Sequence, residues 1–343
     1  MPINLADQGH FDDIVDAIAQ GEVIPFIGAG INLYGRTEQE NWQPGQDLPS
    51  GGELSAYLAL KYKYPSADKK NLLRVSQYAA IMRGSGSLYR RLSEVFDSDY
   101  QIKYSHDFFA SLPGILIPKR RRHPHQLIVT TNYDDVLESA FRKKKEPYDL
   151  VTYIAKGINR GKFRHFKFLG YEDDVDGKPA IIKHTSNLIE SPNDYFDLPF
   201  TDDMVPTRTI ILKIHGAVDR TIGRNKAQAN QQPQDSLDSF VITEDDYISY
   251  LAQTDISRLV PVQLKAKLMS SGFLFLGYGL RDWNLRVILQ RIWGEQELDY
   301  ASWAIQLAPD ELDDKFWGKH NVTIIKARLE EYLVELDKQL QRL

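Results

Sequence analysis

The sequence predicts an α/β fold in which a parallel β-sheet is flanked by helices. Short apolar, β-branched runs alternate with segments in which apolar residues recur at helical spacing. The order strand, helix, strand makes successive strands parallel. Four of the apolar runs end in glycine, asparagine or histidine motifs, and parallel strands all end at one edge of a sheet. These motifs are therefore expected to meet there, in the Rossmann-like arrangement that forms nucleotide sites.

The individual elements follow from periodicity and stop signals. Phe11 to Gln20 carries apolar residues at helical spacing, and Gly21 ends that helix. From residue 50 to 62, leucine and tyrosine recur every fourth residue, and helical character continues to about residue 112. Further helices are expected at 136–141 and 327–340. Strands, recognised by β-branched and aromatic residues, are expected at 23–27, 127–130, 151–154, 209–214, 273–276, 303–307 and 322–325.

We expect a single domain over residues 1–343, with a mainly helical insertion at about 50–118. Residues 155–205 mix glycine, lysine, aspartate and proline with short apolar runs, which favours an irregular insertion with room for a hairpin. A second irregular insertion is expected at about 220–240. Its polar, glutamine-rich stretch over 221–239 is typical of a mobile loop that orders on assembly.

Composition limits the class of protein. The 343 residues are 42% hydrophobic, enough for a substantial core, and their formal net charge of −5 argues against a surface built as a whole for nucleic acid or anionic membranes. The absence of cysteine excludes disulfides, thiolate zinc sites and a cysteine nucleophile. The N-terminus lacks a basic region followed by an apolar one, and no apolar stretch approaches the roughly 18 residues of a membrane span. Cytoplasmic location is the default expectation.

The first motif is a glycine turn that follows the strand 23–27. Gly28, Ala29 and Gly30 would let the backbone turn tightly, and their small side chains would let amide groups approach a pyrophosphate. The spacing departs from the full G-x-G-x-x-G pattern because position 33 is leucine. Taken alone, a structural turn is an equally good interpretation.

Polar motifs follow two other predicted strands. Thr131, Asn132 and Asp134 come directly after one of them, where side chains can leave the sheet and meet a ligand. Asparagine and aspartate are also ordinary helix caps at such a place, so capping is at least as good an interpretation. His215 follows the other strand and precedes Gly216, which would let a ligand or a neighbouring chain come close. A lone histidine here is more often structural.

Taken together and in this order, the motifs at 28–30, 131–134, 215–216 and 277–279 resemble the sirtuin family of NAD-consuming proteins over about residues 20–330. The first resembles the sirtuin Gly-Ala-Gly phosphate turn, and the second its Thr-Gln-Asn-Ile-Asp element. The third resembles the catalytic His-Gly. The Gly-Tyr-Gly turn stands where sirtuins have Gly-Thr-Ser-Leu over the cofactor ribose and phosphates. Four ordered motifs are far more specific than any one of them.

Two departures direct the resemblance to a subgroup. Deacylating sirtuins carry a four-cysteine zinc ribbon, which this cysteine-free chain cannot form, and Asn32 and Gly279 replace two sirtuin serines. The pattern is most similar to the zinc-free sirtuin-like NAD hydrolases of bacterial anti-phage systems. The segments that resemble theirs are 48–58, 241–247 and 277–282.

This second resemblance implies an NAD hydrolase that cleaves the nicotinamide–ribose bond and depletes NAD in antiviral defence by abortive infection. Asn132 would hold the ribose and a water molecule, and His215 would act as general base. NAD would be the substrate, without a metal. The residues implied in binding it are Gly28, Ala29, Gly30, Asn32, Thr131, Asp134, Gly277, Tyr278 and Gly279.

The same resemblance implies a homo-oligomer and a separate protein partner, with a HerA-type ATPase or a short Argonaute as candidates. Nucleic acid would be contacted through that partner, and no membrane would be involved. Two alternatives stay open. One is a zinc-free protein deacylase or ADP-ribosyltransferase. The other is a non-catalytic subunit that binds NAD or ADP-ribose in a DNA-processing complex.

Several further patterns have a structural interpretation beside a functional one. The basic runs 119–122 and 142–145 could contact phosphates, although solvated loops are favoured. Adjacent acids at 244–246 are more typical of the first turn of a helix than of a metal site. Tyr278 could stack on a base, but core packing is more common. Apolar residues within 283–293 could form a subunit interface, and packing against the sheet is favoured.

Overall fold

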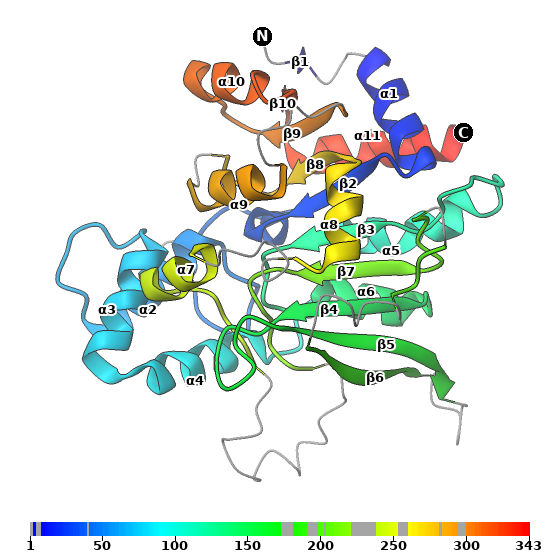
Figure 1. Ribbon diagram of the computed structural model, residues 1–343. Helices are drawn as coiled ribbons and strands as arrows, with labels where there is room; N and C mark the ends of the chain where they lie inside the picture. Colours follow the sequence, from blue (N-terminus) through cyan, green and yellow to red (C-terminus); the bar gives the residue numbers. More distant parts are fainter. Residues whose placement is uncertain are drawn as a thin grey trace.

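The computed structural model describes residues 3–4, 8–39, 41–172, 181–190, 198–201, 204–220, 238–252, 260–280, 283–293 and 300–343. Within them, ten strands form one sheet with the order β1-β10-β9-β8-β2-β3-β7-β4-β5-β6 (Figure 1). The strands are β1 (Ile3–Asn4), β2 (Val23–Ile27), β3 (Leu127–Thr130), β4 (Tyr148–Tyr153), β5 (Phe163–Glu172), β6 (Ile181–Ile189), β7 (Thr209–Lys213), β8 (Gly272–Leu276), β9 (Ser302–Gln306) and β10 (Val322–Lys326).

The sheet is parallel from β1 through β4 in this order, and the hairpin β5–β6 extends it in the antiparallel direction. After β2 the chain continues into β3, on one side of β2, and it later returns to β8 on the other side. In open α/β sheets, ligands bind outside the carboxyl ends of the strands at such a reversal of strand order. The Rossmann-like fold predicted from the sequence is therefore confirmed, and its topology indicates where a site should lie.

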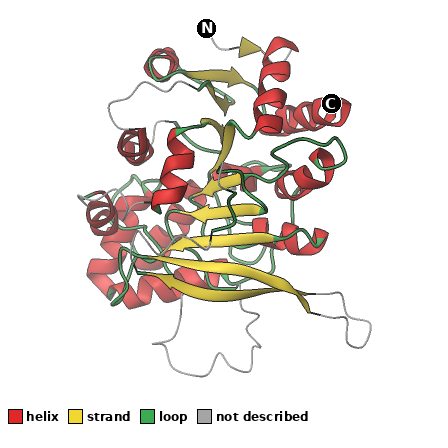
Figure 2. Ribbon diagram, turned by 45° about the vertical axis from the view of Figure 1, so that its right-hand side comes forward, coloured by secondary structure: helices red, strands yellow, loops and turns green. Residues whose placement is uncertain are grey.

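Helices cover both faces of the sheet (Figure 2). On β3, Leu127 and Val129 belong to the core beneath α7 to α9, whereas Ile128 between them belongs to the core beneath α1, α5, α6 and α11. This alternation is the two-residue periodicity of a strand that is buried on both faces. The helices are α1 (Gln8–Gln20), α2 (Gly51–Tyr62), α3 (Leu72–Arg83), α4 (Ser85–Phe96), α5 (Tyr104–Leu116), α6 (Val136–Lys144), α7 (Glu244–Leu251), α8 (Val262–Met269), α9 (Trp283–Trp293), α10 (Glu311–Gly318) and α11 (Leu329–Arg342).

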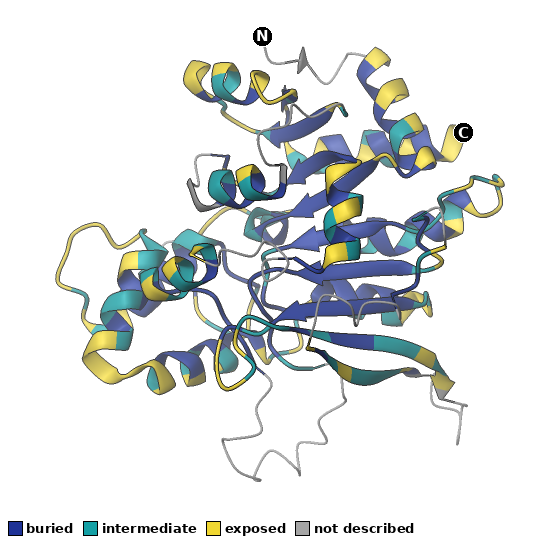
Figure 3. Ribbon diagram, in the orientation of Figure 1, coloured by how far each residue is buried: buried dark blue, intermediate teal, exposed yellow. Residues whose placement is uncertain are grey.

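A third core lies beyond the carboxyl ends of the strands. Leu58 of α2, Val75 of α3 and Leu92 of α4 pack there with Tyr133 and Phe240, which follow β3 and precede α7. Figure 3 shows these helices as a partly buried group beside the deeply buried sheet. The helical layer therefore faces the sheet edge at which the sequence motifs end.

Most of the predicted elements are confirmed, since all seven predicted strands and the helices at 11–20, 50–62, 136–141 and 327–340 are present with small changes of boundary. The stretch up to residue 112, predicted as one helical segment, contains the three separate helices α3, α4 and α5. None of the helices in the described ranges is long and apolar enough to cross a membrane.

The prediction of an irregular stretch over 155–205 is wrong for β5 and β6, although the hairpin that it allowed is present. The sequence did not predict these strands because polar residues interrupt their apolar pattern. His165 is buried because its Nε2 lies 2.8 Å from Asp149 Oδ2 on β4, so a polar side chain occupies a core position. The predicted mobile loop at 221–239 falls almost entirely on residues 221–237, outside the described residues.

Candidate functional site

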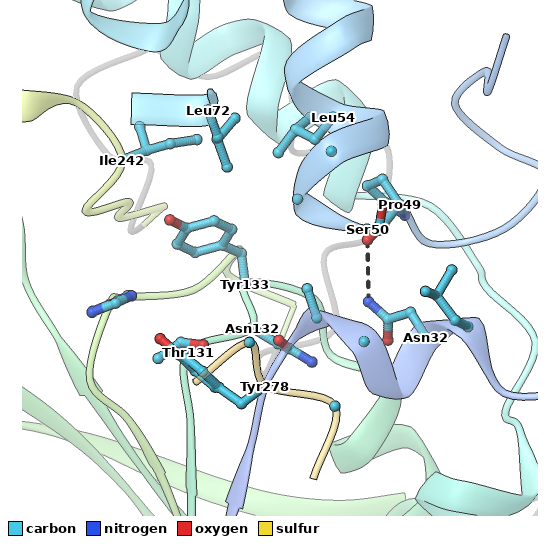
Figure 4. Close-up of a pocket in the computed structure, with 18 of the residues that line it drawn as sticks. Asn32, Pro49, Ser50, Leu54, Leu72, Thr131, Asn132, Tyr133, Ile242 and Tyr278 are labelled. Carbon is cyan, nitrogen blue, oxygen red and sulfur yellow. Dashed lines mark hydrogen bonds between the residues drawn. The ribbon is translucent and has the colours of Figure 1, made fainter. Parts of the chain in front are cut away.

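A pocket of about 610 Å³ lies between the carboxyl ends of the central strands and the helical layer. Pockets of this size are typical of small-molecule and cofactor sites. Figure 4 shows Thr131, Asn132 and Tyr278 on the strand side, and Leu54 and Leu72 on the side of the helices. The predicted site residues that line it are Ala29, Gly30, Asn32, Thr131, Asn132, Asp134, His215, Gly277, Tyr278 and Gly279.

Of the predicted site residues, Gly28 does not line this pocket. Its amide donates a hydrogen bond of 3.0 Å to the carbonyl of Leu276, and its own carbonyl accepts one of 3.4 Å from Nδ2 of Asn132. Gly28 therefore joins the ends of β2 and β8, and its carbonyl holds the side-chain amide of Asn132.

The glycines of the first and last motifs are explained by a contact between the two turns. The amide of Gly30 donates to the carbonyl of Gly277 at 2.7 Å, and a Cβ on Gly277 would lie 2.2 Å from the amide nitrogen of Ile31. Gly277 also has φ +63°, a conformation that other residues rarely adopt. The amides of Gly28 and Gly30 thus have partners within the protein, and the structural interpretation of these glycines holds whether or not a pyrophosphate binds.

The turn after β3 presents Asn132 to the pocket. Its amide nitrogen donates to Oγ1 of Thr130 at 3.1 Å, and Oγ1 of Thr130 donates to the carbonyl of Ile27 at 3.0 Å. With Nδ2 held by Gly28, the side-chain oxygen Oδ1 is buried without a hydrogen-bond partner. Because buried acceptors are nearly always paired, this oxygen is available to a ligand hydroxyl or to water.

Asp134 binds the first backbone amide of α6 from the position before Asp135, which is the N-cap residue. Its Oδ1 accepts a hydrogen bond of 3.1 Å from the amide of Val136 at the start of α6, and its Oδ2 is buried without a partner. Burial raises the pKa of Asp134 to about 6. Asp134 lines the pocket as well, so capping and ligand contact are compatible.

His215 lines the pocket and lies just past the end of β7. Its imidazole is 2% exposed, its Nδ1 lies 3.2 Å from the Tyr247 hydroxyl, and its Nε2 has no partner. Burial lowers the pKa of His215 to about 3, so the ring is neutral near pH 7. Gly216 follows with φ +84°, and a Cβ there would lie 2.2 Å from the carbonyl oxygen of Ser239. The turn that carries His215 packs closely against the segment before α7, where the amide of Val241 donates to the carbonyl of His215 at 2.9 Å.

The helical side of the pocket is held by one buried carboxylate. Glu53 accepts hydrogen bonds from both terminal nitrogens of Arg36, from the amide of Gln39 and from the amide of Ser50, at 2.6–2.9 Å. Ser50 in turn caps α2. Asn32, whose Nδ2 lies 3.5 Å from the carbonyl oxygen of Pro49 (Figure 4), connects this side to the glycine turn.

Sequence reasoning missed most of this helical side as part of the site. Pocket-lining residues that it did not propose include Glu38, Pro49, Ser50, Leu54, Leu72, Phe96, Ile242 and Tyr247. The signal was present in the segments 48–58 and 241–247, which carry the caps of α2 and α7. The acidic residues 244–246 form the first turn of α7, as predicted, and place Tyr247 beside His215.

The other patterns with two interpretations lie in the following places. The basic runs 119–122 and 142–145 precede β3 and β4, so they lie at the amino ends of these strands, opposite the pocket. Within the second run, Arg142 forms an ion pair with Asp135, and Lys144 forms one with Asp107. Tyr278 packs edge-on against Phe26, with ring centroids 5.6 Å apart, while it also lines the pocket. Ile288, Leu289 and Ile292 of α9 are buried in the core, which confirms packing against the sheet for them.

Comparison with known proteins decides the family. The family model described as a SIR2-like domain matches residues 126–325, from β3 to β10. This range contains three of the four motifs, those at 131–134, 215–216 and 277–279. The chain belongs to the SIR2-like family. The sirtuin-like resemblance of the motifs is therefore confirmed.

The SIR2-like chain is also similar to two individual proteins. It is 25% identical over 279 residues to the NAD(+) hydrolase ThsA of Enterococcus faecium, a match that covers 81% of this chain and 41% of the relative. The chain thus spans less than half the length of that relative. Among solved structures, a serine-to-alanine mutant of a Sir2 homologue in complex with ADP-ribose matches with a TM-score of 0.33 and 14% identity, over 96% of each chain.

Proposed function

We propose that this SIR2-like protein is an NAD hydrolase, which cleaves the bond between nicotinamide and ribose and releases nicotinamide and ADP-ribose. The observation that carries the proposal is that Asn132 and His215, from two neighbouring strand ends, each bring a buried and unpartnered polar atom to one pocket. The 25% sequence identity to an NAD(+) hydrolase, over 81% of this chain, supports the choice of substrate.

The chemistry needs little more than these two groups. As the glycosidic bond breaks, positive charge develops on the ribose, and nicotinamide leaves as a neutral molecule, so no strong acid is required. Oδ1 of Asn132 would accept a hydrogen bond from a ribose hydroxyl or from the attacking water. A neutral imidazole can accept the proton that this water loses when it bonds to the anomeric carbon. The products are nicotinamide, ADP-ribose and that proton.

The rest of the pocket would bind the remainder of NAD. The turns at 29–30 and 277–279 would border the pyrophosphate and the adenosine, with Asn32, Thr131 and Asp134 beside them. No group of three or more potential metal-ligating side chains occurs among the described residues, and the reaction as written needs no metal. Water would be the acceptor of the ADP-ribosyl group.

We further propose that the activity serves as an NAD-depleting effector in anti-phage defence and is restrained until a partner or an assembly event releases it. The motif resemblance supports this proposal, because the sirtuin-like hydrolases that the chain resembles commonly act with a second protein. A HerA-type ATPase and a short Argonaute are the candidates, and a homo-oligomer is the expected assembly. Uncontrolled hydrolysis of an abundant metabolite would harm the cell, so restraint is required.

The deciding experiment measures nicotinamide release from NAD by the purified protein, alone and with each candidate partner plus nucleic acid. Asn132→Ala and His215→Ala should each lower the rate by at least about 10²-fold, the contribution typical of a general base or a positioned polar group. An acetylated peptide serves as the rival acceptor. Turnover that requires the peptide would favour the deacylase alternative, and NAD binding without turnover under every condition would favour the regulatory subunit.

A further inference from the structure

A buried ion pair lies directly behind the pocket, and the proposed reaction does not use it. Lys213 on β7 and Glu138 on α6 are 1% and 2% exposed, and Nζ lies 2.7 Å from Oε1. Removing two charges from water is so unfavourable that such a pair adds little to folding stability compared with well-packed apolar residues. Its presence here therefore calls for a role other than stability.

The second contact of Lys213 indicates that role. Nζ also donates a hydrogen bond to the backbone carbonyl of Asp134, the last residue of the motif that begins at Thr131. Lys213 itself precedes His215 by two residues, and its Cα is in register with Thr130 of β3. One ammonium group thus links the strand that leads to His215 with the turn that carries Asn132.

Polar side chains predominate around the ammonium group, beside the apolar Ile27 and Leu137. A cavity of about 10 Å³, which is room for a single water molecule, is lined by Asn132, Asp134, Glu138 and Lys213, together with His106 of α5. Asp134 Oδ2 and Glu138 Oε2 are both buried without hydrogen-bond partners. Without the lysine, two carboxyl groups would face this cavity with no cation to balance them, and the turn would lose the bond that holds its backbone.

We infer that Lys213 is a positioning residue: its ammonium group holds the Asn132 turn and the His215 strand in one fixed relation, so that both side chains act on the same ribose carbon. This inference rests on the proposed NAD hydrolase activity. Positions of reacting groups matter at this level, because a displacement of about 1 Å can lower a rate by about 10²-fold. Glu138 supplies the carboxylate that pairs with the buried ammonium group.

The sharpest test removes both charges together. In the double variant Lys213→Met with Glu138→Met, Asp134 is the one carboxyl group that still faces the cavity, so the protein is expected to fold with a melting temperature somewhat below that of the wild type. The single variant Lys213→Met is expected to be less stable, since it leaves Glu138 unpaired. If the lysine only balances the glutamate, the double variant keeps its activity. If it positions the turn, kcat falls by about 10²-fold with KM for NAD nearly unchanged.

The matched control is Lys267→Met on α8. Lys267 Nζ also donates to a backbone carbonyl, that of Gly21 at 2.7 Å, but this contact lies at the amino end of β2, away from the pocket. We expect this variant to keep the wild-type kcat. A double variant of Lys213 and Glu138 with wild-type kcat would overturn the inference.

A second readout separates this inference from the proposed function. Amide hydrogen exchange of the segment 131–136 reports the turn directly and does not require turnover. It should be faster in the double variant than in the wild type or in Lys267→Met. If the wild type releases no nicotinamide, the proposed function fails while this measurement still decides whether Lys213 holds the turn. Unchanged exchange would count against the inference in either case.

A chemical modification that restores the ammonium group at position 213 serves as the conservative variant. Because the chain contains no cysteine, Lys213→Cys can be aminoethylated at that position alone, in denaturant before refolding. The product carries an ammonium group at the same number of bonds from the backbone as lysine. Recovery of kcat is expected. Failure to recover it in protein that refolds with the wild-type melting temperature would contradict the inference.

Discussion

The two sides of the pocket are built in different ways. The strand side consists of turns that directly follow β2, β3, β7 and β8, and backbone contacts fix it, such as the bond of 2.7 Å between Gly30 and Gly277. The helical side consists of the segment 34–50 and helices α2 and α3, and side chains fix it, above all Glu53 with Arg36. The residues of the proposed chemistry lie on the strand side. The helical side shapes the volume into which a substrate must fit.

This difference predicts different consequences of mutation. A change on the strand side should damage folding or kcat, because backbone turns cannot shift without moving Asn132 or His215. A change on the helical side should act mainly on KM, because Glu53 holds a wall of the pocket and touches no reacting group in the proposed mechanism. The following substitutions test this contrast in order of the expected effect.

The largest effect is expected from Gly277→Ala. The new Cβ would lie 2.2 Å from the amide nitrogen of Ile31, in a residue with φ +63°, so the two glycine turns would have to separate. Strain and overpacking of this kind cost roughly 2–4 kcal/mol of unfolding free energy. Denaturant unfolding would measure the loss. Gly279→Ala is the control for stability, since a Cβ there meets nothing within 4 Å; equal losses for both would contradict the explanation.

Glu53→Gln tests the helical side. The substitution removes the charge that balances Arg36, whose side chain is 9% exposed, while it keeps the size of residue 53. We expect a loss of about 1–3 kcal/mol, typical of a hydrogen bond to a charged group, and a raised KM for NAD with kcat nearly unchanged. Steady-state kinetics would separate the two parameters. A fall in kcat at constant KM would show that this wall takes part in positioning the reacting groups.

The contrast also explains what the sequence could and could not predict. The strand side was predictable because each of its motifs directly follows a run of apolar residues, and a parallel sheet brings all such ends together. The helical side was not, because Arg36 meets Glu53, and Asn32 meets Pro49, through contacts between residues 17 positions apart that no local pattern encodes. Even on the strand side, the reason for the glycines could not be read from the sequence. Gly28 and Gly30 pack against the end of β8, which lies about 250 residues away along the chain.

The pH dependence of stability should reveal the buried imidazole of the strand side. Burial lowers the pKa of His215 to about 3 in the folded state, against about 6.5 in the unfolded chain. Between these values the unfolded chain binds the proton and the folded one does not, so this histidine makes stability fall as the pH drops below about 6.5. The expected slope is about 1.4 kcal/mol per pH unit for one proton.

Asp134 acts in the opposite direction, since its raised pKa of about 6 makes the folded state bind the proton first, and it partly offsets the histidine. His215→Gln removes the histidine contribution alone. Urea unfolding at several pH values between about 4 and 7 should therefore show a smaller loss toward acid for His215→Gln than for the wild type. Identical slopes in the two proteins would mean that His215 is not buried as a neutral ring.

The smallest expected effects come from two helix caps, one on the helix that carries Glu53 and one on the helix that places Tyr247 beside His215. Ser50 caps α2 and Thr243 caps α7, each as part of a capping box, with Glu53 and Asp246 as the respective partners. Replacement of either cap by alanine should cost about 1 kcal/mol of stability. The kinetic consequences should differ although the stability losses match. Ser50→Ala loosens the helical side and should raise KM, whereas Thr243→Ala loosens the helix that holds Tyr247 against His215 and should lower kcat. If the two variants changed kcat and KM in the same way, the proposed difference between the helical side and the surroundings of His215 would be contradicted.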